Sequence, residues 1–250
     1  MVSYFLPALS TYAGDIDFII DLIFWLVGFW FILSEGVFFW LIFRYKKKEG
    51  VKAEYITGEL PEHKRWITIP HFLVLFCDIF ILYYAIVAWY EVKQNLPDPD
   101  ATVRIIGQQW AWTFVHEGPD GVLDTADDIK EINELHISVD TLYNYKLESK
   151  DVMHSFSVPV FRLKQDALPG RIITGWWEAT GVGEYMIQCT EICGVGHGLM
   201  GARIFIESKE QHAAWIADKS PVALAALTNP MLAPQTPMQV PMQVLRQVKE

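Results

Sequence analysis

The chain has 250 residues, a formal net charge of −10 and a hydrophobic content of 52%. Its three cysteines are too few for a disulfide scaffold. From Tyr90 onward it carries 21 acidic and 13 basic residues, which argues against nucleic acid as a partner. Length and hydrophobicity together fit one folded domain plus membrane-spanning segments.

Two long apolar runs predict a transmembrane helical hairpin within residues 1–92. They cover about 18–43 and about 67–90, and each is long enough to cross a bilayer with some tilt. The loop between them carries seven basic residues: Arg44, Lys46, Lys47, Lys48, Lys52, Lys64 and Arg65. Because basic loops stay on the cytoplasmic side, we expect the N-terminus and everything after Tyr90 to lie outside. The sequence thus predicts an integral membrane protein.

Residues 102–219 have the pattern of an all-β sandwich or barrel. A proline-punctuated linker over 93–101 precedes them. Short runs rich in β-branched and aromatic residues then recur between turns. These runs are Thr102–Ile106, Gln109–Val115, Glu134–Val139, Tyr143–Glu148, Ser155–Val160, Ile172–Glu178, Glu184–Gln188 and Ala202–Glu207. Ser208 with Gln211 predicts a capped helix to about Lys219, and the composition of 220–250 predicts a low-complexity tail.

The segment 118–128 is an acidic insertion between two of the predicted strands. Its four aspartates, on a loop that contains glycine, could chelate calcium. The spacing does not follow an EF-hand loop, so a solvated hairpin tip is the favoured interpretation. A loop that docks a partner is a third option.

The segment 189–200 concentrates side chains that bind metals. It holds Cys189, Cys193, His197 and Met200, and His154 lies upstream. Thiolate, thioether and imidazole together suit copper better than magnesium or calcium. One cysteine would indicate a mononuclear site, whereas two predict two metals held through shared sulfurs. Three glycines disfavour a helix here and favour a tight loop. A disulfide between the cysteines, with the histidine incidental, is the alternative.

Taken in order, four blocks resemble subunit II of the haem–copper cytochrome c oxidases. They are Cys-x-Glu-x-Cys-x3-His-x2-Met at 189–200, Gln109–Trp112, Asp151–Pro159 and Lys164–Arg171. The resemblance covers roughly residues 18–218. It implies a cupredoxin-like domain with a binuclear copper A centre on the periplasmic side of a respiratory membrane, such as the bacterial plasma membrane. The chain would be the electron inlet of a proton-pumping terminal oxidase.

The resemblance also implies a set of metal ligands. The bridging thiolates would be Cys189 and Cys193, and the other ligands His154, His197, Met200 and the backbone carbonyl of Glu191. The side chain of Glu191 would join a magnesium or manganese site shared with subunit I, as suits a hard carboxylate. No haem is expected on this chain, because no Cys-x-x-Cys-His follows the copper motif.

Partner contacts follow from the same resemblance. Trp110 matches a tryptophan through which cytochrome c, or a similar soluble donor, would pass electrons toward haem in subunit I. Asp151 and Asp140 would add docking charge that tunes the association rate. Asp166 and Arg171 match residues near the subunit I interface, and a surface ion pair is the simpler alternative for them.

The family commonly has a glutamate near a proton-channel opening, just before the second span. Here His63 occupies that position, with Glu62 beside it. Both residues are therefore candidates for a proton path, and a plain loop role is the alternative for His63.

Three other functions use similar parts. The same module could serve a haem–copper nitric oxide reductase, from which only subunit I would distinguish it. Nitrous oxide reductase carries this copper motif but is soluble, so the hairpin argues against it. A membrane-anchored copper carrier would need a site that releases its metal, and two bridging thiolates argue against that. Such a carrier also needs only one membrane span, whereas this sequence predicts two.

Overall fold

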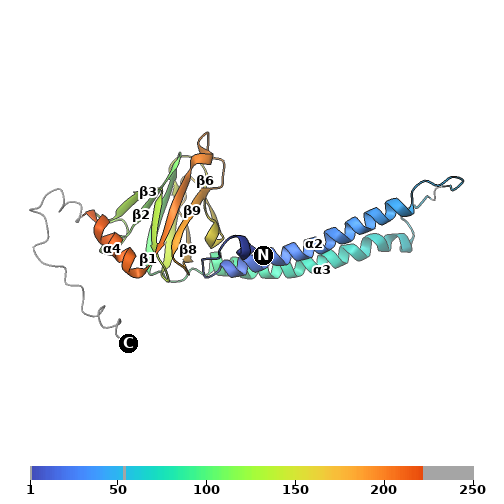
Figure 1. Cartoon of the computed structure of the whole chain (residues 1–250), viewed down its shortest axis with the longest axis horizontal. Coiled ribbons are helices and arrows are strands. Elements are labelled where there is room, and N and C mark those ends of the chain that lie inside the picture. The colour runs from blue at the N-terminus through green and yellow to red at the C-terminus, as the bar shows by residue number, and fades with distance from the viewer. Residues whose placement is uncertain (1, 53–54, 222–250) are drawn as a thin grey trace, which may run out of the picture.

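The computed structural model describes residues 2–52 and 55–221, in which a helical hairpin projects from one side of a β-domain (Figure 1). The helices are α1 (Val2–Phe5), α2 (Ala13–Arg44) and α3 (Pro61–Trp89), and a π-helical turn, Tyr90–Gln94, continues α3. The tail predicted over 220–250 lies outside the described residues from 222 onward.

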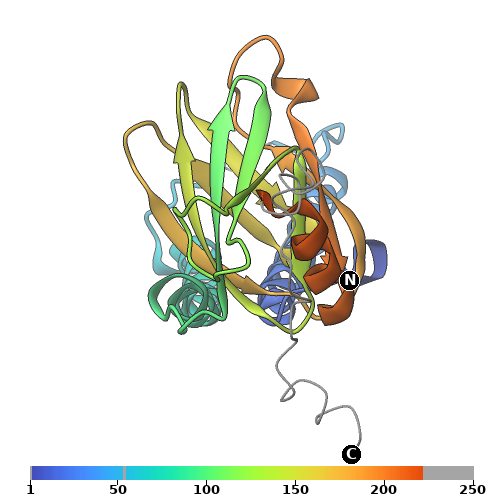
Figure 2. The same cartoon turned by 90° about the vertical axis from the view of Figure 1, so that its left-hand side faces the viewer.

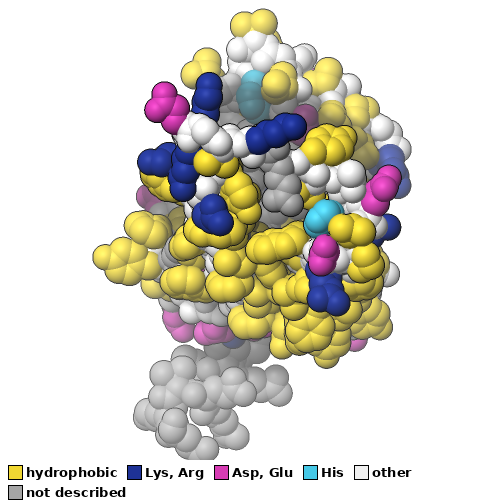
Figure 3. Space-filling model, turned by 90° about the vertical axis from the view of Figure 1, so that its right-hand side faces the viewer, with side chains coloured by type: hydrophobic (Ala, Val, Ile, Leu, Met, Phe, Trp, Pro, Cys, Tyr) yellow, Lys and Arg dark blue, Asp and Glu magenta, His cyan; other side chains and the backbone are white. Residues whose placement is uncertain are grey.

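Both long helices extend beyond the predicted apolar runs. α2 begins at Ala13 and carries Asp15 in its first turn, where a carboxylate complements the helix dipole. Pro61 starts α3, at a position where its missing N–H costs nothing. By length and composition each helix could cross a membrane, and only 6% and 0% of their apolar windows are buried, unlike the core helix of a soluble protein. Lysine and arginine side chains appear around the far end of the hairpin, beside a broad hydrophobic surface (Figure 3).

The β-domain is a sandwich of two five-stranded sheets, with orders β3-β2-β1-β5-β8 and β4-β10-β9-β6-β7. The strands are β1 (Ala101–Gln108), β2 (Ala111–His116), β3 (Ile129–Ile132), β4 (Glu134–Ser138), β5 (Leu142–Ser149), β6 (His154–Val158), β7 (Leu163–Ala167), β8 (Ile173–Glu178), β9 (Gly183–Cys189) and β10 (Gly201–Glu207). β1 runs parallel to β5 and β4 parallel to β10, and the other pairs are antiparallel.

The sandwich confirms the predicted all-β domain, because each sheet turns apolar side chains inward. β5 alternates strictly between half-buried and buried residues, as a strand with one covered face does. The inner layer holds large rings, among them Trp112, Phe156 and Trp177, all fully buried. The prediction missed β3 and β7, since their short sequences, IKEI and LKQDA, carry charges that mask the alternation.

The start of α2 is clamped to the β-domain. The Arg162 guanidinium donates to both carboxylate oxygens of Asp17, at 2.6 and 2.9 Å. It also donates to the carbonyls of Leu6, Pro7 and Pro159. These five hydrogen bonds satisfy a buried ion pair completely, so the hairpin and the domain are joined by more than the linker.

Helix α4 (Lys209–Lys219) covers the end of the domain away from the hairpin (Figure 1). Its predicted start is confirmed, because Ser208 and Gln211 form a reciprocal capping box. Imidazole Nδ1 atoms of His136 and His212 lie 2.8 and 3.0 Å from the two carboxylate oxygens of Glu207. The Trp215 ring stacks on both imidazoles, and His116 meets its edge. His116 from β2 and His136 from β4 thus pack against His212 and Trp215 of α4.

We expect acid to loosen α4. Burial, then the nearby His212 and His136, lower the pKa of His116 to about 3, and burial also lowers the pKa of His212. An unfolded histidine titrates near 6.5, so the unfolded chain binds protons first as the pH falls. Stability is therefore full above about pH 6.5 and drops toward pH 3, by about 1.4 kcal/mol per pH unit for His116.

Hydrogen–deuterium exchange of the α4 amides between pH 7.5 and 5 would measure this loss. Replacing His116 by phenylalanine should make the exchange rate of the α4 amides less dependent on pH, and the dependence that remains would come from His212. If the exchange rate changed with pH equally in the variant and in the unmodified protein, the assignment to His116 would be wrong.

Candidate metal centre

The predicted ligands meet at one end of the sandwich. Cys189 ends β9, His154 starts β6, and the two strands pair so that Phe156 lies opposite Cys189. The connection from β9 to β10 forms a loop that projects beyond the sheets, next to the β1–β2 hairpin tip (Figure 2). A short 3-10 turn, His197–Leu199, returns this metal loop (190–200) to β10. The rigid sheet therefore supplies two ligands and the loop supplies the rest.

Each cysteine sulfur has its own set of neighbours. Cys189 Sγ lies 3.9 Å from His154 Nδ1 and 3.3 Å from the carbonyl oxygen of Glu191. Cys193 Sγ lies 3.6 Å from His197 Nδ1 and 3.8 Å from Met200 Sδ. The two sulfurs are 3.7 Å apart, well beyond the roughly 2.05 Å of a disulfide. They are free thiols arranged as a pair, each with one imidazole and one further donor.

Most of the donor residues are shielded from water, and His197 is half-buried. The ligand atoms of His154, Cys189 and Cys193 lie within 4.8 Å of one another, and all three residues are buried. Within residues 2–52 and 55–221, no other group of His, Cys, Asp and Glu converges in this way. Burial, with the adjacent Cys189, raises the pKa of the Cys193 thiol to about 11. A bound cation must displace that proton, so affinity for a soft metal will rise with pH.

Asp151 holds the far side of His154. Its Oδ1 lies 2.8 Å from His154 Nε2, and its Oδ2 accepts the Gln109 backbone N–H at 2.7 Å. Burial opposes ionisation, but the hydrogen bonds from Gln109 and His154 outweigh it and lower the pKa of Asp151. A carboxylate in this position fixes which imidazole nitrogen faces the sulfurs. The Gln109 side-chain amide donates to the carbonyl of Cys193 at 2.7 Å, which ties the hairpin tip to the metal loop.

Trp110 lies directly on the metal loop. Its side chain is 42% exposed, and its ring covers two glycines. A Cβ added to Gly196 would come within 2.5 Å of the indole, and one added to Gly194 within 3.3 Å. The glycines therefore permit an aromatic ring to reach from solvent to the backbone that carries the ligands. Val195 and Leu199 stand exposed beside it on the same loop.

The fit between Trp110 and Gly196 can be tested. We expect Gly196→Ala to displace the indole, because a methyl group would overlap the ring, while the ligands stay in place. Copper binding should persist, and electron uptake from a soluble donor should slow strongly. Gly198→Ala is the matched control, since a Cβ there meets nothing within 4 Å. Equal uptake by both variants, measured by stopped-flow absorbance, would contradict a role for this contact.

The other predicted contact residues lie in different places. Asp140 precedes β5, at the end of the sheet where Ala101 pairs with Tyr143, whereas Trp110 follows the opposite end of β1. The structure therefore does not bring Asp140 together with Trp110. Asp166 pairs with Ser155, next to His154, and Arg171 is exposed in the connection after β7.

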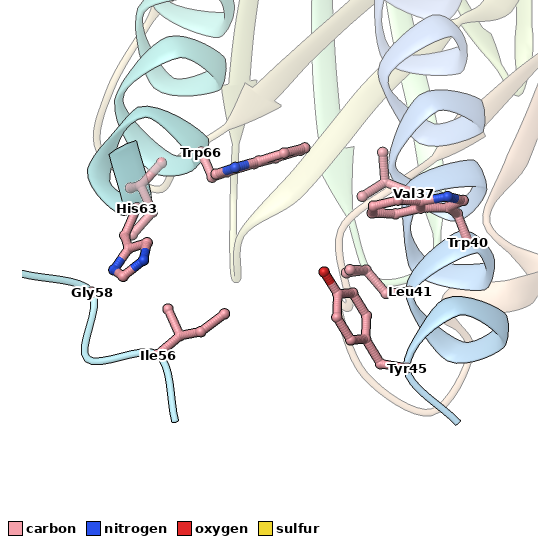
Figure 4. A pocket seen from close by; sticks show the side chains of 9 residues that line it. Val37, Trp40, Leu41, Tyr45, Ile56, Gly58, His63 and Trp66 are labelled. Carbon is pink, nitrogen blue, oxygen red and sulfur yellow. The ribbon is translucent and has the colours of Figure 1, made fainter. Parts of the chain in front are cut away.

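Glu62 and His63 occupy the first turn of α3, at the far end of the hairpin from the β-domain. The imidazole of His63 lines a cavity of about 550 Å³ between the two helices. Trp40 from α2, Tyr45 directly after α2 and Trp66 from α3 form other walls of this cavity (Figure 4). Glu62 is exposed.

The acidic insertion 118–128 folds on itself between β2 and β3. Asp120 and Asp127 accept backbone and side-chain hydrogen bonds within the loop, and Asp124 pairs with Arg104 at 2.7 Å. Its carboxylates are engaged with the chain itself, in keeping with a solvated hairpin tip.

Sequence reasoning missed three supporting residues. The place of Asp151 three residues before His154 is a signal of its orienting role, whereas the resemblance implies docking charge only. Gln109 has no role of its own within the Gln-Trp-Ala-Trp block. From the sequence, Gly196 is predicted only to disfavour a helix. The roles of Gln109 and Gly196 depend on contacts between the β1–β2 tip and the metal loop, which spacing along the chain does not reveal.

Comparison with known proteins gives a consistent picture. Residues 119–208 match the family described as cytochrome C oxidase subunit II, periplasmic domain. The alternative cytochrome c oxidase subunit 2 of Bradyrhizobium diazoefficiens is 29% identical over 240 residues, which cover 86% of this chain and 84% of that protein. The cytochrome c oxidase subunit 2 of Thermostichus vulcanus is 27% identical over 245 residues, covering 78% and 72%.

Among solved structures, the periplasmic domain of subunit II of cytochrome oxidase from Bradyrhizobium japonicum is 26% identical, with a TM-score of 0.45, and covers 50% of this chain and 96% of that one. The sequence matches extend over both the helical hairpin and the β-domain that carries the His, Cys and Met cluster. Residues 119–208 therefore carry a cytochrome c oxidase subunit II periplasmic domain, and over most of its length the chain is similar to cytochrome c oxidase subunit 2 proteins.

Proposed function

We propose that this chain is the electron inlet of a haem–copper terminal oxidase and that it holds a binuclear copper A centre. The observation that carries the proposal is the pairing of donors around two sulfurs 3.7 Å apart. Each sulfur has a separate imidazole, and the two further donors, a thioether and a carbonyl oxygen, are divided between them. A single four-coordinate metal would leave at least two of these six donors unused.

The donor set fits copper. Thiolate, imidazole and thioether are soft or borderline ligands that favour copper over magnesium, calcium or manganese. Cys189 and Cys193 would bridge, and the remaining ligands would be His154, His197, Met200 and the carbonyl of Glu191. When bound, a copper pair supplies one-electron redox chemistry.

The residues of the chain keep such a site rigid and dry. His154 is fixed by β6 on one side and by Asp151 on the other, so its ring cannot turn when the metal changes charge. Buried Met200 and Cys193 exclude water. Trp110 reaches from the solvent to the metal loop, which suits it to receive an electron from a soluble donor such as cytochrome c.

The partners follow from the family. Subunit I would take the electron to haem, and the Glu191 side chain would help to hold magnesium or manganese at that interface. Asp166 and Arg171 would also contact subunit I. Asp151 would contribute negative charge where the soluble electron donor docks. A proton path beginning near Glu62 or His63 would open at the other end of the hairpin.

Electron paramagnetic resonance of the full-length, copper-loaded chain tests the proposal. We expect hyperfine splitting from one unpaired electron shared over two coppers, and the signal should survive a chelator in excess. Splitting from a single copper would mean that the cysteines do not bridge. Rapid loss of the metal to the chelator would favour a copper carrier.

A further inference from the structure

A chain of aromatic rings leads away from the metal centre through the core of the sandwich. The Trp112 ring meets His154 at 5.9 Å between centroids and Phe156 at 5.4 Å. Phe156 meets Trp177 at 6.3 Å, and Trp177 meets Tyr143 at 6.4 Å. All of these side chains except Tyr143 are fully buried, and Tyr143 is 4% exposed. Trp112, Trp177 and Tyr143 are the readily oxidised rings of this series, and Phe156 fills the gap between the two indoles, so an electron would tunnel past it.

The chain of rings ends at a tyrosine that has a base beside its hydroxyl. Tyr143 Oη lies 3.3 Å from His212 Nε2, and the other ring nitrogen of His212 lies 3.0 Å from Glu207 Oε2. This arrangement sets the roles: His212 donates from Nδ1 to the carboxylate and accepts the phenol proton at Nε2. Glu207 would stabilise the imidazolium that forms.

Tyrosine cannot readily lose an electron in a buried site unless its proton leaves at the same time. Burial raises the pKa of Tyr143 to about 12, so the phenol stays protonated at neutral pH. The Ser138 N–H donates to the same oxygen at 3.0 Å, and His212 is the acceptor placed to take the proton.

We propose that Tyr143, with His212 and Glu207, is a redox-active site that collects oxidising equivalents from Trp112, beside the metal centre, and from Trp177, deeper in the core. An oxygen-centred radical, of the hydroxyl or peroxyl type, removes one electron from Trp112 or Trp177 and is itself reduced. The resulting indole radical cation takes an electron from Tyr143, whose phenol proton moves to His212 Nε2. The products are neutral tryptophan, a neutral tyrosyl radical and an imidazolium paired with Glu207.

Tyr145 provides an internal comparison. It stacks on the same Trp177 at 5.1 Å, closer than Tyr143. Its hydroxyl faces the Lys93 ammonium at 3.4 Å, which is a donor and offers no place for a phenol proton. If distance to Trp177 alone decided, the radical would form on Tyr145. Because only Tyr143 of the two has a proton acceptor at its hydroxyl, we expect the radical on Tyr143.

The ring chain contacts the predicted metal site at His154, and only this connection to the metal rests on the proposed function. The site at Tyr143 does not depend on a bound metal. The experiment therefore uses the metal-free, full-length chain in detergent. Photogenerated ruthenium(III) tris-bipyridine oxidises the protein, and freeze-trapped radicals are recorded by high-field electron paramagnetic resonance. Tyrosine deuterated at its β-carbon separates tyrosyl from indole and thiyl radicals.

We expect a tyrosyl component whose g-tensor carries the signature of a hydrogen bond donated by an imidazolium. Tyr143→Phe should remove it and increase the indole radical, and Tyr145→Phe should leave it unchanged. His212→Gln should also abolish it with Tyr143 still present, a result that loss of packing alone would not give. Persistence of the component in Tyr143→Phe or His212→Gln, or its loss in Tyr145→Phe, would overturn the proposal. Failure here would leave the copper assignment untouched, because that is tested on the loaded chain.

Discussion

Replacing Cys193 by serine will abolish the shared two-copper signal and the electron uptake that depends on it. The Cys193 sulfur is the one atom near His197, Met200 and Cys189 together. A serine hydroxyl is a hard, protonated donor and does not replace a bridging thiolate. Cys189, His154 and the Glu191 carbonyl would remain, so the variant should bind no more than a single copper.

Copper stoichiometry and electron paramagnetic resonance of the loaded chain measure this outcome. Cys77→Ser is the matched control, because Cys77 lies within α3, outside the β-domain that holds the cluster, and should load copper normally. A shared-electron signal that survives Cys193→Ser would show that the cysteines do not bridge.

Replacing Arg162 by methionine will loosen the junction between α2 and the β-domain. The Arg162 and Asp17 side chains are only 5% and 10% exposed, so the variant leaves a carboxylate buried without its partner. Breaking a buried pair in this way costs about 3–5 kcal/mol. The N-terminal segment also loses the hydrogen bonds to the carbonyls of Leu6 and Pro7. We expect residues 6–17 to exchange amide hydrogens much faster, while the metal loop stays protected.

Arg203→Met is the control for this experiment. Arg203 also pairs with two carboxylates, Glu184 and Glu134, but its side chain is 50% exposed. Water screens such a pair, so its loss should change exchange far less. If the two variants behaved alike in hydrogen–deuterium exchange, burial of the Arg162 pair would not be what holds the junction.

Local sequence pattern determined the elements of this protein. The length of two apolar runs predicted the hairpin, and strand-length runs between turns predicted the sandwich, because both signals repeat within a few residues. The capping box of α4 was predictable for the same reason: Ser208 and Gln211 are three residues apart. The copper-type donor set was also visible, since four of its side chains fall within 189–200.

Tertiary structure decided what those elements bring together. Antiparallel pairing of β6 with β9 carries His154 to a cysteine 35 residues away, and the fold of the loop gives each sulfur its own imidazole. The turn before β6 brings the Asp151 carboxylate to the His154 ring, so that it supports this imidazole, and the pairing of β1 with β5 leaves Asp140 at the other end of the sheet.

Two long-range contacts that organise the molecule had no signal in the chain. Arg162 meets Asp17 across 145 positions, and Tyr143 meets His212 across 69. Periodicity specifies which face of an element is buried, but partners this distant are set by how whole sheets and helices pack. The sequence alone therefore determined which ligands and which elements are present, and only the packed sandwich decided which side chains share a proton, a metal or a charge.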